Sequence, residues 1–282
     1  MAVLLGLAAS LSWGVADFLG GLASRRVRAT LAVLLSQGVG LVLLLALLPL
    51  FAAEPLTRAA IVWGGLSGIA GGLGLLFLYR GLGRGRMSVV APVSAVVGAS
   101  VPVVADLAAG RSVGSVTLAG LVVALAALAL VSSGPQRGAD RPRSAFMASG
   151  VPEGLLAGLG FGIFFVLFAR SGDASGYWPL LTLRVASVTM LGGIALATRS
   201  LARPGRRAGG MLVGAGVLDV CANLLYLLGT RRGLISVVAV LASLYPAVTV
   251  LLARAALGER LHRTQVVGLA GAAVGIVLIT AG

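Results

Sequence analysis

Ten apolar runs, separated by short polar segments, cover almost the whole of this chain. A helix needs about 20 apolar residues to cross the hydrocarbon core of a bilayer, so the runs predict ten membrane-spanning helices. They lack the alternating polarity of barrel strands. The sixth and tenth runs are short and must extend into flanking residues. The runs are Val3–Leu22, Leu31–Phe51, Ala60–Leu78, Met87–Leu107, Val113–Val131, Gly154–Phe168, Tyr177–Ala197, Met211–Leu228, Leu234–Leu252 and Val266–Thr280.

Composition agrees with a lipid environment. Hydrophobic residues make up 59% of the chain and charged residues only 11%, whereas soluble domains carry about 25% charged residues. Backbone groups in lipid must be satisfied internally, which favours helices. The net charge of +14 is spread over short clusters between the runs, so it indicates topology rather than a nucleic-acid partner. We therefore expect an all-α polytopic protein of the inner cell membrane.

The arginines are distributed unevenly between the two sides of the predicted bundle. The five connections after odd-numbered spans hold 16 of the 22 basic residues, all of them arginine, and the other four connections hold 5. The remaining one, Arg184, lies inside the seventh span. The positive-inside rule then predicts that the arginine-rich side is cytoplasmic and that both termini are outside. The first span begins without a basic segment before it and is expected to be retained.

The chain also repeats itself at an offset of 148 residues. A five-span copy has an odd number of spans, so the second copy must be inverted in the bilayer, as in many secondary transporters. We expect a first repeat at 1–134, a linker at 135–150 and a second repeat at 151–282. The offset superposes Gly14 on Gly162, Gly68 on Gly216, and the sequence of residues 88–91 on that of residues 236–239.

Three ionisable residues lie well inside predicted spans, where a charge is costly and usually functional. Arg184 and Asp219 lie at similar depths in consecutive helices, so they predict either a structural ion pair or a substrate or proton site. Asp17 lies in the first span and is either functional, solvated at the interface, or bonded to Arg25 or Arg26.

A fourth ionisable residue and three prolines lie in the fourth and ninth spans. Asp106 is close enough to a helix end to reach the interface. Pro92 and Pro102 in the fourth span, and Pro246 in the ninth, each remove a helix hydrogen bond. Kinked helices in corresponding places of two halves point to a binding site. Kinks facing lipid without a role are the alternative.

Aromatic residues make up only 5% of the chain, so their positions carry information. Trp13 and Phe161 correspond across the repeat, and each directly precedes a glycine. Asn223 and Tyr226 follow Asp219 on the eighth span, and Tyr245 precedes the proline of the ninth. These five side chains are candidates to line a substrate cavity. Packing between helices is the alternative for each.

The segment from Leu244 to Ile279 resembles the end of an EamA-type member of the drug/metabolite transporter superfamily. The shared features are a proline in the penultimate helix, the turn at 258–260, Gln265 and a glycine-spaced last helix. The first copy matches with SVPVVADLAAGR at 100–111, but Arg111 replaces the glutamate that the family usually has. The SWG sequence at 12–14 resembles the family's first helix.

This resemblance covers nearly all of the chain and implies a definite architecture. It implies two inverted five-helix halves around a central cavity lined by spans 1, 3, 4, 6, 8 and 9. Family members are mostly exporters of amino acids and other small metabolites. The family is commonly drawn with cytoplasmic termini, which is opposite to the arginine count. A monomer or a homodimer would suit this architecture.

The function classes that remain are few. There is no nucleotide-binding motif, so a transporter would use alternating access driven by protons or by exchange. A membrane-embedded enzyme acting on a lipid or a peptide is the rival, but the chain has no HExxH or G-x-S-x-G motif, and His262 lies in a loop. Asp17 and Asp219 are the only plausible catalytic carboxylates for such an enzyme. A channel is disfavoured because no ring of like charges recurs. We expect no catalytic residues, metal or cofactor.

Overall fold

The computed structural model describes residues 1–51, 55–110, 114–132, 149–171, 176–230, 244–258 and 262–281. These residues form ten α-helices and no β-strand. A π-helical turn, η1 (Ala60–Gly64), leads into α3, and a 3-10 turn, η2 (Ala169–Ser171), follows α7. The α-helices are α1 (Ala2–Ser24), α2 (Ala29–Phe51), α3 (Gly65–Arg84), α4 (Met87–Ala108), α5 (Ser115–Ser132), α7 (Val151–Phe168), α8 (Trp178–Ala197), α9 (Arg206–Thr230), α11 (Tyr245–Leu257) and α12 (Arg263–Ala281).

Most helix boundaries follow the apolar runs, but α9 begins five residues before the predicted Met211 and α11 ends five residues after the predicted Leu252. Seven of the described helices have the length and composition to cross a bilayer, and three shorter apolar segments accompany them at Ser115–Ala127, Tyr245–Leu257 and Arg263–Ile279. The chain is thus an all-helical multi-pass membrane protein. The sixth and tenth spans extend beyond their apolar runs, as expected. The predicted ninth span is described only from residue 244 onward, and most of the predicted linker lies outside the described residues.

The predicted end of the third span was wrong by six residues. Helix α3 continues to Arg84, so Arg80 and Arg84 belong to the helix and not to the connection. Arginine extends a membrane helix readily, because its aliphatic stem covers apolar surface while its charged head reaches water. The connection to α4 is therefore only Gly85 and Arg86. This extension matters for the site, because it places Tyr79 inside the bundle.

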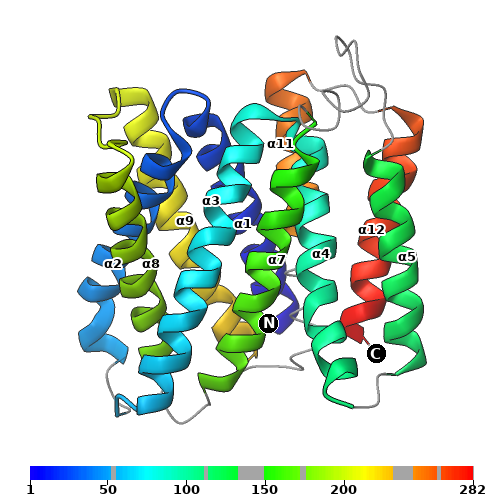
Figure 1. The fold of residues 1–282 in the computed structure, drawn as a ribbon, viewed down its shortest axis with the longest axis horizontal. Coiled ribbons are helices and arrows are strands. Elements are labelled where there is room, and N and C mark those ends of the chain that lie inside the picture. The colour runs from blue at the N-terminus through cyan, green and yellow to red at the C-terminus, as the bar shows by residue number, and fades with distance from the viewer. Residues whose placement is uncertain are drawn as a thin grey trace.

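The helices lie side by side with their axes roughly parallel (Figure 1). Helices α5 and α12 form a pair at one end of the long axis, and α2, α8 and α9 gather at the other. Between them lie α1, α3, α4, α7 and α11. Both termini lie toward the same end of the bundle. Small residues permit the close contacts, as is usual in membranes. At Gly275, for example, an added Cβ would lie 2.7 Å from Cβ of Ala124.

Two glycine contacts between the halves of the chain are reciprocal. A Cβ at Gly216 on α9 would collide with the carbonyl oxygen of Ser36 on α2. A Cβ at Gly68 on α3 would collide with the carbonyl oxygen of Leu183 on α8. Gly68 and Gly216 are 148 residues apart, and Leu183 is within one residue of the position 148 after Ser36. Each half thus supplies the glycine in one contact and the backbone in the other.

The end of the bundle opposite the termini is tightly closed. An apolar core there includes Phe18, Val33, Leu78, Leu82 and Met87 from the first half and Leu191 and Leu212 from the second. Gly150 adopts φ +83°, a conformation that suits glycine, and it contacts Gly85. Polar contacts cross the same end: Arg28 donates to the Thr198 carbonyl at 3.1 Å, and Arg80 lies 3.7 Å from Glu153. The candidate site lies directly beneath this closure.

Candidate functional site

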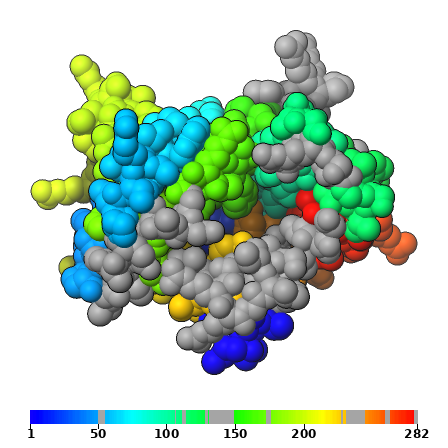
Figure 2. Space-filling view, turned by 90° about the horizontal axis from the view of Figure 1, so that it is seen from below, coloured from blue at the N-terminus to red at the C-terminus, as the bar shows by residue number. Residues whose placement is uncertain are grey.

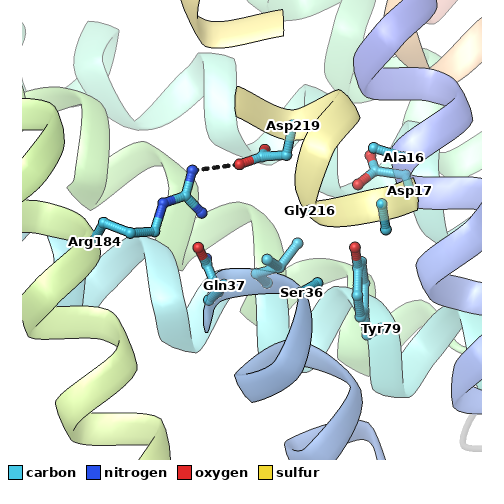
Figure 3. Close-up of a pocket in the computed structure, with 10 residues that line it drawn as sticks. Ala16, Asp17, Ser36, Gln37, Tyr79, Arg184, Gly216 and Asp219 are labelled. Atoms are coloured by element: carbon cyan, nitrogen blue, oxygen red, sulfur yellow. Dashed lines mark hydrogen bonds and ion pairs between the residues drawn. The ribbon is translucent and has the colours of Figure 1, made fainter. Parts of the chain in front are cut away.

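A small polar cavity lies between α1, α2, α3, α8 and α9 (Figure 3). The space open to water inside it is about 10 Å³, which is about the minimum that holds one water molecule. The structure therefore describes a nearly closed state of the site. The lining residues come from both halves of the chain: Ala16, Asp17, Ser36, Gln37, Leu75, Tyr79, Arg184, Ala215, Gly216 and Asp219.

The predicted ion pair between Arg184 and Asp219 is present at one side of this cavity. Arg184 Nη2 donates to Asp219 Oδ2 at 2.5 Å, and the two side chains are 6% and 27% exposed. Gly40 on α2 makes room for the guanidinium, since a Cβ there would lie 3.3 Å from Arg184 Cζ. The Nε atom of Arg184 is buried and has no hydrogen-bond partner among the described residues. One donor of the guanidinium is thus unused.

Asp17 lies within electrostatic range of Asp219 and is only 8% exposed. Figure 3 shows the Asp17 carboxyl group directed from α1 toward α9, whereas the Asp219 carboxyl group points away from it, toward Arg184. No hydrogen bond or ion pair to Asp17 is formed within the described part of the chain, so the predicted alternative of a bond to Arg25 or Arg26 is not realised there. The site combines two carboxyl groups with one guanidinium.

Three polar side chains of the cavity were not singled out from the sequence. Ser36 and Gln37 lie on α2, and Tyr79 lies on α3 with its ring against Gly20. Gln37 is 6% exposed, and its Oε1 atom has no partner among the described residues. Gln37 is the one amide side chain within the second apolar run, and this polar position could have identified it from the sequence. Tyr79 was missed because the predicted third span ended at Leu78, the residue directly before it.

Three of the predicted aromatic residues form a cluster next to the cavity. The Trp13 ring lies 5.8 Å from that of Tyr226 and 6.4 Å from that of Tyr245, measured between centroids. Helix α11 is held against α1 here, because Thr249 Oγ1 donates to the Gly14 carbonyl at 3.1 Å. Trp13 is four residues before Asp17, which is about 6 Å along α1 toward the N-terminus. The cluster therefore lies between the cavity and the end of the bundle that carries the termini.

Figure 2 looks at that end of the molecule. The surfaces of α3 (sky blue) and α7 (green) border a hollow, in which part of α9 (gold) is visible at greater depth. The aromatic cluster and the hollow thus lie on the same side of the charged residues. The apolar closure lies on the other side.

Asn223 and Phe161, two further predicted residues, are not among the residues that line the cavity. Asn223 donates to the Asp219 carbonyl at 2.6 Å and is occupied on its own helix. Phe161 packs on Gly74 and Gly98, away from the cavity lining.

The helix-kink residues and Asp106 are only partly described. Pro92 and Pro102 lie within α4. Pro246 is in the first turn of α11, and because residues 231–243 lie outside the described part, its predicted kink stays a prediction. The side chain of Asp106 also lies outside the described residues.

The charged groups that line the cavity are two carboxyl groups and one guanidinium, and no histidine or cysteine is among the described lining residues. His262 is exposed and contacts Thr264 at 3.0 Å, far along the chain from any lining residue. Among the described residues there is no cluster of His, Cys, Asp or Glu that could hold a metal ion. The chemistry that the lining supports is ion pairing, hydrogen bonding and proton transfer.

Comparison with known proteins gives a consistent result. A profile described as the EamA-like transporter family matches the chain twice, over residues 1–133 and 148–281. A solved structure titled "Crystal structure of protein" is similar over 99% of this chain and 97% of its own, with a TM-score of 0.67 and 16% sequence identity. This likeness concerns the fold alone. No curated protein matches the sequence.

Proposed function

This chain belongs to the EamA-like transporter family, and from that premise we propose that it is a secondary transporter that exports small metabolites by alternating access. The observation that carries the proposal is the charged cavity, which is lined by residues of both matched halves. A site shared between two repeats can open to either side of the membrane when one half moves against the other. Amino acids are among the metabolites that the family resemblance suggests.

We further propose that the halves are inverted repeats around an axis in the membrane plane. The reciprocal contacts of Gly68 and Gly216 support this arrangement, because exchange of the two halves converts one contact into the other. Helices α1 and α7 also run in opposite directions, since α1 ends and α7 begins at the same closed end of the bundle. Paired helices such as α2 and α8 have bounds that agree within two residues after the shift of 148.

Proton coupling is the driving force that the site favours. When both carboxyl groups are ionised, the cavity holds one more negative than positive charge, and an uncompensated charge inside a membrane costs about 2.5 kcal/mol or more. A proton or a cationic substrate removes that cost. A movement that separates Asp219 from Arg184 would leave the carboxylate without its counter-charge. The conformation of the protein would thereby be linked to the charge of the site.

The uneven distribution of the arginines predicts which end of the bundle faces the cytoplasm. The tightly closed end of the bundle carries Arg25, Arg26, Arg28 and the four arginines at 199–207, and we propose that it faces the cytoplasm of a cell with this protein in its inner membrane. The state described here would then be closed toward the cytoplasm.

Flux measurements in proteoliposomes test the proposed function. Vesicles carrying the purified chain and a library of radiolabelled metabolites would be given an imposed pH gradient. We expect saturable movement of at least one metabolite by the wild type, and loss of pH-driven movement in Asp219→Asn. His262→Gln is the control, because His262 is exposed and lies outside the cavity. Absence of flux for every metabolite in the wild type would refute the proposal.

A further inference from the structure

The substrate class can be narrowed from the charges and the aromatic residues beside them. We propose that this site binds a primary amine cation with an aromatic or apolar body, and that Asp17 holds the ammonium group. This rests on the proposed function, and it deepens it for the same site. Three features of the site support this: the buried carboxyl group of Asp17, the aromatic rings around Trp13, and the pairing of Arg184 with Asp219.

Asp17 supplies the anchoring charge. It is more than nine-tenths buried, it lines the cavity, and no described residue bonds to it. The Arg184 charge is engaged by Asp219 on the other side of the space. A buried carboxylate without a partner requires a cation or a proton. The cavity has room for about one water molecule, and an –NH3⁺ group is of similar size.

The Tyr79 hydroxyl provides a second acceptor on the Asp17 side of the cavity. Figure 3 shows this hydroxyl directed toward the part of the cavity where the Asp17 carboxyl group lies, and it also shares a hydrogen bond with Ser36. An ammonium group has three donors and no acceptor, and a tyrosine hydroxyl can accept a hydrogen bond from it. Gln37 lies on the other side of the cavity, below Arg184, and is not part of this arrangement.

The body of the ligand would lie among the aromatic rings. Trp13 is one helical turn from Asp17 on the same face of α1, and Tyr226 and Tyr245 flank its ring. All three are partly exposed, and the cluster lies between the cavity and the end of the bundle that carries the termini. Aromatic faces attract cations and bind apolar groups. An amine with its charge at Asp17 would thus place its apolar body where these rings are.

The same arrangement disfavours a zwitterionic amino acid. A substrate carboxylate would need the Arg184 guanidinium, which Asp219 already holds at 2.5 Å. It would also approach two carboxyl groups, and like charges close together are repulsive. An amine without a carboxylate avoids both difficulties.

Equilibrium binding tests the inference without requiring transport. Three probes share one body: 2-phenylethylamine is a cation, L-phenylalanine adds a carboxylate, and 2-phenylethanol is neutral. Titration calorimetry on the protein in lipid nanodiscs would compare them. We expect the amine to bind roughly tenfold or more tightly than either other probe, because a charge-assisted bond in a buried site is worth that much.

Variants assign the binding to this site. Asp17→Asn keeps the shape but removes the charge, and should weaken amine binding by roughly tenfold or more. Trp13→Leu should weaken it by a few-fold, and His262→Gln, at an exposed position outside the cavity, should leave it unchanged. Asp17→Asn must elute as a monodisperse species for the comparison to count, and Trp13→Leu provides an independent test if it does not.

The outcomes distinguish this inference from the proposed function. Phenylalanine binding as tight as the amine, undiminished amine binding in Asp17→Asn, or no amine binding at all would each overturn the inference. Flux of another metabolite would leave the proposed function intact in all three cases. Absence of all flux, with amine binding as expected, would overturn transport but not the site.

Discussion

Removal of Arg184 should destabilise the protein more than removal of the whole ion pair. Arg184→Leu leaves the carboxylate of Asp219 facing a nearly closed cavity with no cation beside it. Loss of one partner of a buried pair costs roughly 3–5 kcal/mol. Asp219 is 27% exposed in its side chain, so water relieves part of this cost, and we expect the lower end, about 3 kcal/mol. The double variant Arg184→Leu with Asp219→Leu removes both charges and should lie close to the wild type.

Thermal unfolding in detergent, followed by tryptophan fluorescence, measures this difference. For a chain of this size each kcal/mol shifts Tm by about 2–4 °C, so Arg184→Leu should unfold roughly 6–12 °C below the wild type. The double variant should recover most of that shift. A double variant that is less stable than Arg184→Leu alone would refute the reasoning, because the two changes would then add instead of compensating.

Three further predictions follow from the packing, the topology and the charges. Gly216→Ala should lower Tm, because its Cβ would meet the Ser36 carbonyl, whereas Gly192→Ala should not, since nothing lies within 4 Å of that position; equal Tm values would contradict the close contact. A reporter fused after Gly282 should behave as extracytoplasmic, and a cytoplasmic signal would reverse the orientation. The double Leu variant removes the Arg184–Asp219 pair and should lose pH-driven flux, so full pH-driven flux in that variant would exclude coupling through the pair.

The sequence was a good guide to the helices, for a physical reason. In lipid the length of an apolar run is set by bilayer thickness, so boundaries such as those of α2 and α8 could be read within two residues. Three boundaries failed, each beside arginines that suggested a connection: the end of α3 at Arg80 and Arg84, the start of α9 at Arg206 and Arg207, and the end of α11 at Arg254. Charge alone does not end a membrane helix, because a long side chain can carry its charge to the interface.

The site was predictable only in part. Arg184 and Asp219 could be paired from their depths, since two opposite charges in adjacent membrane helices have few other partners. The role of Gln37 and Tyr79 depends on which helix faces the cavity, and that depends on contacts such as Gly216 with α2, which join residues far apart in the chain. Trp13 and Phe161 correspond across the repeat, but neither is among the residues that line the cavity; Trp13 lies next to it, and Phe161 packs on Gly74 and Gly98.

Alternating access is the central claim, and thiol labelling tests it most directly. Cys221 is the single cysteine, so Cys221→Ser provides a background in which Ala16→Cys is the only thiol. Ala16 lines the cavity next to Asp17 and is small enough to be replaced by cysteine. A membrane-impermeant thiol reagent would be applied to vesicles of each orientation. We predict labelling from both sides of the membrane, with a ratio that changes when substrate or a pH gradient is added. Labelling from one side only, unaffected by either, would contradict the account.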